Sequence, residues 1–296
     1  MAMTSWRAEP TTRKAGWLAL TAAILTIGLI TYGAWVRASG SGLGCPDWPL
    51  CEGSLVPTLE GDTAVEFGHR VFAGITMLMV AVSAWFAWSG RATDALLAKI
   101  LVGALGLIFV QAVLGGITVL TELNGDVRLA HLTIALATLT LLTAGAIRGL
   151  DVQGSPYPGV RIASVFAVWT GIVVLLGGSI VGSNLSAACP GLPLCDDRSP
   201  LDAAWMHGIH RTAATLLLFA LIGLGFWLRK HRGTMFSIAL NHTAVLLIVL
   251  QIGIGVSAIS QSLPMYLRIM HLGMASLIWW AVATQWLLAL KGRSSH

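Results

Sequence analysis

Four of the eight histidines in this 296-residue chain stand where their side chains could do chemistry. His69 and His131 form one pair and His210 and His271 a second, each near the outer start of a long uncharged run, about one helical turn inside it. Ionisable side chains are rare in membrane-spanning segments and usually mark a functional site there. Two neutral imidazoles that face each other suit axial coordination of a haem iron, whereas a tetrahedral zinc ion would need more ligands.

Arginines accompany all four histidines. Arg128 and Arg268 each stand three residues before a histidine, on the same helical face. Arg70 and Arg211 each follow a histidine directly. Fixed guanidinium groups can pair with haem propionates through charge-assisted hydrogen bonds. The alternative is that these four arginines simply face lipid headgroups at the helix starts.

Glu66 is the main difference between the two histidine pairs. It precedes His69 by three residues, and His207 occupies the equivalent place before His210. A carboxylate near the bilayer is costly unless it is paired or used, so Glu66 is a candidate for proton transfer. The alternative is an acidic residue at a helix N-terminus, stabilised by the helix dipole. We interpret the first pair as catalytic and the second as the holder of a permanent haem.

The four cysteines form two C-x5-C pairs in loops predicted to lie outside the membrane. Proline and glycine between them favour tight turns, and the outer side is oxidising in bacteria. We therefore expect the disulfides Cys45–Cys51 and Cys189–Cys195. A zinc site is one alternative, although two thiols per loop are few for that metal. A redox-active Cys45–Cys51 pair that exchanges electrons with a partner is another.

Long helices must position these groups, because the chain is too apolar for an ordinary soluble enzyme. Hydrophobic residues make up 56%, charged residues 10%, and the mean hydropathy is +0.79. The uncharged runs predict an all-α integral membrane protein with eight transmembrane helices. The expected helices cover residues 15–37, 66–90, 98–120, 128–149, 160–182, 206–228, 235–258 and 267–290.

The positive residues predict the orientation. With those helices, twelve of the eighteen lysines and arginines fall on one side, which the positive-inside rule makes cytoplasmic. Both termini are then cytoplasmic, and the cysteine loops and histidine sites lie toward the outer side of the cell membrane. The net charge of +5 follows from this topology and does not indicate nucleic-acid binding. The twelve are Arg7, Arg13, Lys14, Arg91, Lys99, Arg148, Arg161, Arg229, Lys230, Arg232, Lys291 and Arg293.

An internal repeat is visible at an almost constant spacing. The cysteine pairs are separated by 144 residues, the His-Arg pairs at 69 and 210 by 141, and the Arg-x-x-His-Leu segments at 128 and 268 by 140. We predict two four-helix bundles, residues 1–150 and 151–296. An even number of helices in each makes them parallel repeats about an axis along the membrane normal.

Taken together, these motifs resemble the bacterial haem A synthase family over nearly the whole chain. The resemblance implies an enzyme that oxidises the C8 methyl of haem O to a formyl group, through an alcohol and a hydrated aldehyde, to make haem A for cytochrome oxidase. It implies that His210 and His271 ligate haem b, that His69 and His131 bind the substrate haem O, and that Glu66 is the catalytic acid or base. Possible partners are a haem O synthase, factors that assemble the terminal oxidase, membrane lipid and a second copy of the chain.

Three other functions compete with this one. A di-haem b-type protein could transfer electrons from quinol with no chemistry on haem, although Glu66 argues against two equal conducting sites. A quinone-linked membrane thiol oxidase would use the cysteines and leave the histidines unexplained. A secondary transporter with parallel repeats would explain neither.

Overall fold

The computed structural model describes residues 10–231 and 233–293 as an all-helical fold. Within these residues, eight helices are long and apolar enough to span a membrane, as predicted. They are α1 (Pro10–Ser39), α2 (Gly61–Ser89), α3 (Ala95–Leu120), α4 (Gly125–Gly149), α5 (Val160–Gly182), α6 (Leu201–Lys230), α7 (Met235–Ser260) and α8 (Met265–Arg293). A short 3-10 helix, η1 (Ser41–Leu43), follows α1. Arg7 and Arg232, two of the twelve positive residues assigned to one side, lie outside the described residues.

Six helices begin before the starts that hydropathy predicted. Among them, α2 begins at Gly61 and α6 at Leu201, each five residues early. Hydropathy detects only the apolar part of a helix, and the polar first turns continue it because Asp62 and Asp202 interact favourably with the helix dipole. The four site histidines therefore lie six to nine residues inside their helices, which is about 9–14 Å rather than one turn.

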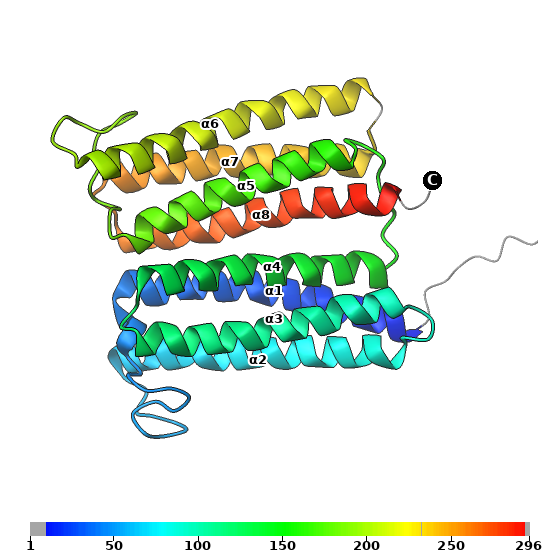
Figure 1. Ribbon diagram of the computed structural model, residues 1–296, viewed down its shortest axis with the longest axis horizontal. Coiled ribbons are helices and arrows are strands. Elements are labelled where there is room, and N and C mark those ends of the chain that lie inside the picture. Colours follow the sequence, from blue (N-terminus) through cyan, green and yellow to red (C-terminus); the bar gives the residue numbers. More distant parts are fainter. Residues whose placement is uncertain (1–9, 232, 294–296) are drawn as a thin grey trace, which may run out of the picture.

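The helices form two rings of four. In the first ring, α1 packs against α2, α2 against α3, α3 against α4 and α4 against α1, and α5–α8 follow the same order in the second. Figure 1 shows the two groups side by side, with the helices of each running back and forth along one direction. In such a ring α2 lies diagonally opposite α4, and α6 opposite α8. Residues of diagonal helices that point inward meet at the centre of the ring.

Helices α1, α4, α5 and α8 join the two rings, through contacts of α1 with α8 and of α4 with both α5 and α8. Two tryptophans of α8 donate hydrogen bonds across this seam. The Trp279 Nε1–H donates to Thr140 Oγ1 at 3.1 Å, and the Trp280 Nε1–H donates to Thr143 Oγ1 at 3.0 Å. Such polar contacts between helices stabilise their association within a bilayer, where the hydrophobic effect does little.

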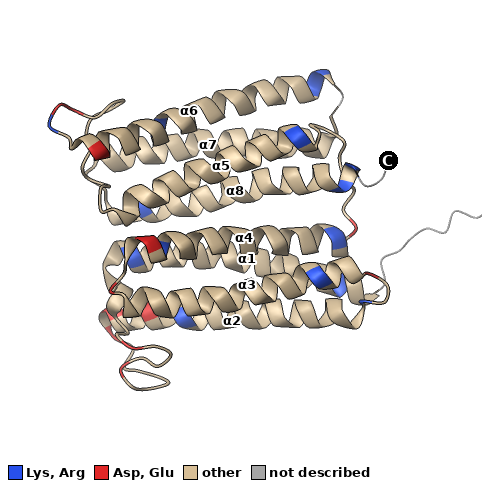
Figure 2. Cartoon of the chain, viewed as in Figure 1, with Lys and Arg blue, Asp and Glu red and all other residues tan. Residues whose placement is uncertain are grey.

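Each ring has its main cluster of buried aliphatic side chains in the half away from the cysteine loops. Both loops project from the same end of the helices (Figure 1), and the histidines lie toward that end. Figure 2 shows the acidic residues gathered mostly there as well. The packed half is therefore a scaffold for the other half. The largest members of the clusters are Leu97, Leu101, Leu139 and Leu142 in the first ring and Leu217, Leu221 and Leu228 in the second.

Candidate functional site

The two histidine pairs stand on diagonal helices. His69 of α2 and His131 of α4 are close enough for their charges to interact, and the same holds for His210 of α6 and His271 of α8. Within the described residues no group of three or more His, Cys, Asp or Glu side chains could hold a metal ion. Each ring therefore offers a metal two imidazoles, which is the ligand set of a bis-histidine haem.

The surroundings of the imidazoles fit that role. All four rings are half-buried. The Nδ1 of His210 lies 3.1 Å from the Val173 carbonyl oxygen, so an Nδ1–H would donate there and leave Nε2 as the ligand atom. The Nδ1 atoms of His69, His131 and His271 are buried without a hydrogen-bond partner in the described part of the chain.

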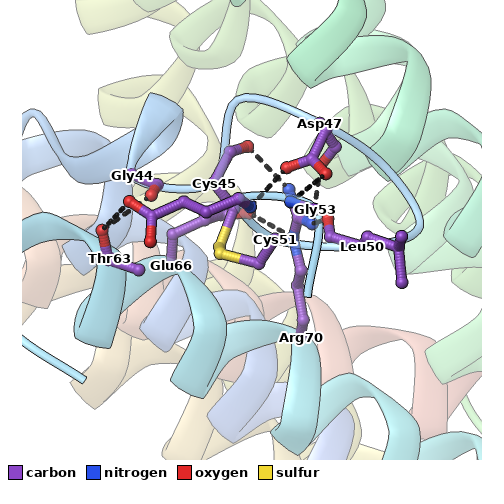
Figure 3. The surroundings of a disulfide bond; sticks show 10 residues. Gly44, Cys45, Asp47, Leu50, Cys51, Gly53, Thr63, Glu66 and Arg70 are labelled. Atoms are coloured by element: carbon purple, nitrogen blue, oxygen red, sulfur yellow. Dashed lines mark hydrogen bonds and ion pairs between the residues drawn. A yellow bond between two sulfur atoms is a disulfide. The ribbon is translucent and has the colours of Figure 1, made fainter. Parts of the chain in front are cut away.

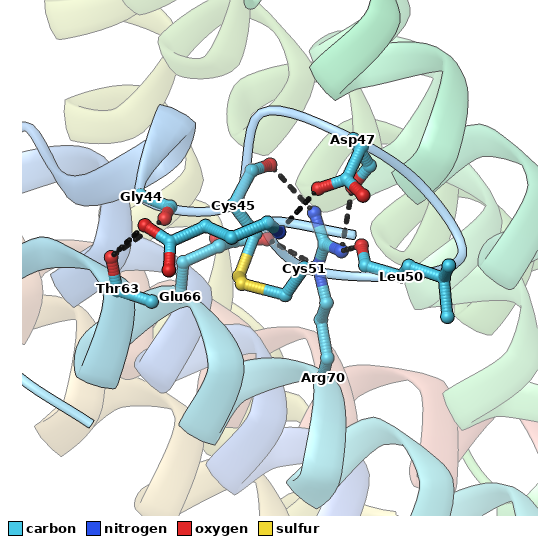
Figure 4. A network of polar contacts seen from close by, with 9 residues as sticks. Gly44, Cys45, Asp47, Leu50, Cys51, Thr63, Glu66 and Arg70 are labelled. Atoms are coloured by element: carbon cyan, nitrogen blue, oxygen red, sulfur yellow. Dashed lines mark hydrogen bonds and ion pairs between the residues drawn. A yellow bond between two sulfur atoms is a disulfide. The ribbon is translucent and has the colours of Figure 1, made fainter. Parts of the chain in front are cut away.

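Arg70 holds the first cysteine loop. Its guanidinium donates to the carbonyl oxygens of Cys45 at 2.9 Å, Asp47 at 2.9 Å and Leu50 at 2.7 Å, and its Nε–H donates to Glu66 Oε1 at 3.1 Å. Figure 4 shows this fan of contacts, with Arg70 rising from α2 into the loop. The planar guanidinium suits several fixed acceptors at once. Arg70 is one of the predicted propionate candidates, and in this structure its donors contact the loop backbone and Glu66.

Arg211 does the same in the second ring. It donates to the carbonyl oxygens of Gly191 at 2.7 Å, Pro193 at 3.0 Å and Cys189 at 3.0 Å. Among the described residues it forms no ion pair, because the place of Glu66 is taken by His207. That histidine is buried, with Nε2 3.0 Å from the Leu185 carbonyl oxygen.

Arg128 and Arg268 keep donors free for a ligand. The Nε of Arg128 is buried without a partner among the described residues, and Arg268 has one long contact of 3.4 Å to the Ala38 carbonyl oxygen. Arg37 at the end of α1, which no sequence motif indicated, interacts electrostatically with both of these arginines. No acidic side chain in the described part of the chain forms an ion pair with any of the three. The helices that join the two rings therefore carry three arginines without an acidic ion-pair partner among the described residues.

Glu66 lies deeper than a helix-terminal acid. It is the sixth residue of α2, it is 6% exposed, and Asp62 occupies the first turn instead. Because the helix dipole acts mainly within the first turn, dipole stabilisation does not explain Glu66. Glu66 forms an ion pair with Arg70, so the carboxylate is both buried and paired, and it lies beneath the first disulfide loop (Figure 3).

Both expected disulfides are present. Cys45 bonds Cys51 and Cys189 bonds Cys195, each with an S–S distance of 1.96 Å, so the zinc alternative is wrong. Cys45 and Cys51 are at most 1% exposed. Thiol–disulfide exchange requires a thiolate to reach a sulfur atom, so burial favours a structural role over the redox-active alternative.

The first loop is also tied within itself and to α3. The Asp47 carboxylate accepts hydrogen bonds from the backbone N–H groups of Gly53 and Glu52, and these lower its pKa below the usual value, with Gly53 contributing most. Trp48 packs on Gly116 so closely that a Cβ there would lie 2.6 Å from Trp48 Cδ2. No sequence motif indicated this contact, although Gly116 is one of two consecutive glycines.

Tyr32 of α1 is a second missed residue. Its ring meets the imidazole of His69 edge-on, with ring centroids 5.6 Å apart and planes at 75°. At the 144-residue spacing of the cysteine pairs, the second half has Leu176 in its place. Aromatic rings in this arrangement attract each other weakly, so Tyr32 helps to orient His69 in the first ring.

This fold and site define a class: a multi-pass membrane protein with eight candidate spans, two pairs of histidines and a disulfide loop at one end of each ring. The chain belongs to the COX15-CtaA family of cytochrome oxidase assembly proteins, whose family model matches residues 16–64 and 58–283.

Three similar proteins share the name "Heme A synthase". The chain is 33% identical over 212 residues to "Heme A synthase" of Symbiobacterium thermophilum, covering 65% of this chain and 69% of that protein. It is 28% identical to "Heme A synthase" of Halalkalibacterium halodurans over 84% of this chain and 88% of that one. With the Geobacillus kaustophilus protein of the same name, the identity is 26% over 95% and 93% of the two chains.

Proposed function

We propose that this protein is a haem A synthase, which oxidises the C8 methyl of haem O to a formyl group. The observation that carries the proposal is the pair of half-buried imidazoles on diagonal helices in each ring, with no third metal-ligating group beside them among the described residues. Membership of the family and the name shared by its relatives support the reaction. The bound haem iron supplies the redox chemistry, and the chain's residues hold the haem and move protons.

The architecture that we propose is two parallel four-helix repeats, residues 1–150 and 151–296, with both termini in the cytoplasm. The near-constant spacing of the matching motifs supports the repeat, and so does the position of both cysteine loops at one end (Figure 1). The excess of lysine and arginine at the other side supports the orientation in the cell membrane. The histidine sites would then face the outer leaflet.

We assign the substrate haem O to His69 and His131 and a resident haem b to His210 and His271. The assignment rests on what differs between the rings. Glu66 and Tyr32 stand beside the first pair only, whereas the Nδ1 contact with the Val173 carbonyl holds a ring of the second pair. A site that performs chemistry needs the carboxylate, and a permanent site needs a fixed ligand.

Arg37, Arg128 and Arg268 would bind the carboxylates of the propionates. Arg37 interacts electrostatically with both Arg128 and Arg268, and none of the three has an acidic ion-pair partner among the described residues, so an anion placed beside them would be stabilised. Arg128 stands one turn from His131 on α4, and Arg268 one turn from His271 on α8. The cluster could therefore receive propionates from both rings. Arg70 and Arg211 would fix the loops above the two sites instead.

Glu66 would hold or accept a proton at its carboxylate while the methyl group is oxidised. Its position under the loop keeps it away from bulk water, and Arg70 stabilises the charged form. The ion pair with Arg70 therefore influences how readily the Glu66 carboxylate takes up a proton. We further propose that a haem O synthase supplies the substrate within the bilayer and that the product goes to assembly of the terminal oxidase.

Expression in a bacterial host that makes haem O but no haem A tests the function. Haem A in the pigment extracted from membranes is the expected result. His69→Ala should abolish haem A and leave haem b on the purified protein, whereas His210→Ala should remove the haem b. His231→Ala, an exposed histidine at the opposite end of the helices, is the control and should behave as the unaltered protein.

Two other results would each reject the synthase. A purified protein that carries haem but makes no haem A in this host would be an electron-transfer cytochrome. If the purified protein carries no haem in either ring, the remaining candidate functions are the thiol oxidase and the transporter.

A further inference from the structure

Each of the four site histidines rests against a glycine of the preceding helix. The Cε1 edge of His69 faces Gly33 of α1, His131 faces Gly115 of α3, His210 faces Gly177 of α5 and His271 faces Gly255 of α7. The glycines are spaced like the motifs around them, with Gly33 and Gly177 separated by 144 residues and Gly115 and Gly255 by 140. The contact is therefore a feature of all four sites and not an accident of one.

We propose that these glycines are positioning residues that seat the haem-ligand imidazoles, and that the second ring seats its imidazoles more tightly than the first. This inference rests on the proposed function. A side chain on a helix leans back toward the N-terminus and covers the preceding turn. Without a side chain, each glycine leaves a flat patch of backbone on which an imidazole can lie.

The glycines of the second ring lie closer to their imidazoles than those of the first ring do. A Cβ built on Gly177 would lie 3.0 Å from His210 Cε1, and one on Gly255 would lie 3.2 Å from His271 Cε1. In the first ring the same distances are 3.4 Å at Gly33 and 3.7 Å at Gly115, which are ordinary van der Waals contacts. An added methyl group would therefore displace the imidazoles of the second ring and leave those of the first ring in place.

The missing side chain at Gly177 also leaves a backbone carbonyl oxygen accessible to the imidazole as a hydrogen-bond acceptor. The Val173 carbonyl lies one turn before Gly177, on the surface that a side chain at 177 would cover. His210 Nδ1 reaches that oxygen at 3.1 Å, while the other three Nδ1 atoms are buried without a partner in the described residues. The second ring of helices thus holds both of its imidazoles closely against glycines, and a hydrogen bond fixes the orientation of His210, as a permanent haem requires. The first ring leaves its imidazoles room to adjust while a substrate enters and a product leaves.

The test compares single alanine variants of the full-length purified protein. The readouts are haem b per chain, the rate of haem b release to apomyoglobin, and the electron paramagnetic resonance signal of the ferric haem, which depends on imidazole orientation. Gly177→Ala and Gly255→Ala should change that signal. They should also speed haem b release about tenfold or more, because the strain of fitting one more methyl group into a packed site weakens binding by at least about tenfold. Gly33→Ala and Gly115→Ala lie in the ring that we assign to haem O, and they should change the rate of haem O release by less than about tenfold, because an added Cβ would meet His69 or His131 only at an ordinary van der Waals distance.

Gly253→Ala is the matched control. Gly253 lies two residues before Gly255 on α7, and a Cβ there would meet nothing within 4 Å. Unchanged haem b in Gly177→Ala and Gly255→Ala would overturn the inference while leaving the proposed function intact. Equal losses in Gly253→Ala would also overturn it, because helix packing in general would then be the cause. An unaltered protein without haem would reject the proposed function itself. If Gly177→Ala does not fold, Gly255→Ala provides the same comparison. Failure of both variants to fold would contradict the inference, because the glycines would then be needed for folding and not only to position the haem-ligand histidines.

Discussion

The carboxylate of Glu66 and the guanidinium of Arg70 lie one turn apart on α2 and form an ion pair, with Arg70 Nε 3.1 Å from Glu66 Oε1. The remaining donors of Arg70 hold the backbone of the first cysteine loop. The same carboxylate is thus in a position to handle protons and to fix the arginine that closes the loop. These two roles predict different results for different substitutions.

Glu66→Gln separates the two roles. The amide oxygen can still accept the hydrogen bond from Arg70, but the side chain can no longer take up a proton. We expect Glu66→Gln and Glu66→Ala both to lower haem A formation at least about a hundredfold, the lower end of what a general acid or base contributes. Haem O should accumulate and haem b should stay bound, as shown by analysis of extracted pigments.

Glu122→Gln, an exposed acid at the start of the turn after α3, is the control and should keep full activity. Full activity of Glu66→Gln with loss in Glu66→Ala would show that Glu66 only positions Arg70.

Trp48 and Gly116 should be energetically coupled. The second half has Leu192 and Val256 at the matching places, a medium pair instead of a large and a small residue. Gly116→Val alone should destabilise the protein by about 1–3 kcal/mol, because Trp48 must move. Trp48→Leu added to Gly116→Val should recover part of that loss, which thermal unfolding in detergent would measure as a double-mutant cycle. Strictly additive effects would mean that the two side chains do not meet.

The Cys45–Cys51 disulfide should be structural. Its loop has a sequence separation of 6, so loss of the bond should cost about 2 kcal/mol through the entropy of the unfolded chain. Cys45→Ser should therefore unfold at a lower temperature while keeping haem A formation at moderate growth temperature. Cys189→Ser is the comparison in the other ring. Loss of turnover in Cys45→Ser alone, with the protein still folded, would restore the redox role.

Asp47 should make the first loop sensitive to acid. Hydrogen bonds from Gly53 N–H and Glu52 N–H lower the pKa of Asp47 in the folded loop. The stabilisation is then present above the unfolded pKa of about 3.8 and is lost as the pH falls through the lower folded value. Reduction of Cys45–Cys51 by a phosphine active in acid should stay slow near pH 4 and speed up below it. Asp47→Asn should be reduced faster at neutral pH, and equal rates for the two proteins would exclude the carboxylate.

Arg37 should influence both haem sites if the arginine cluster binds propionates. Arg37→Gln removes a cation that interacts with Arg128 and Arg268. Because a nearby positive charge favours the reduced haem, which carries less positive charge, the midpoint potential of haem b should fall. Arg13→Gln, at the start of the same helix, is the control. A redox titration with the same potential in both variants would remove Arg37 from the site.

Much of the site could be read from the sequence because its parts repeat. His69 and His210 each precede an arginine, and the cysteine pairs recur at a similar spacing, so shared depth and shared loops follow from helix periodicity alone. Hydropathy predicted the eight helices for the same local reason. The helix starts were less accurate because the polar first turns carry no apolar signal, which is why Glu66 lies inside α2 and not at its end.

Contacts between distant segments needed the tertiary structure. Besides Glu66, the guanidinium of Arg70 reaches backbone carbonyls 20 to 25 residues earlier, and backbone carbonyls have no sequence signature. Arg37 lies near Arg128 and Arg268 only because α1 packs against both α4 and α8. Residue type and local spacing determine which groups lie at which depth in the membrane, while the packing of helices decides which of those groups meet.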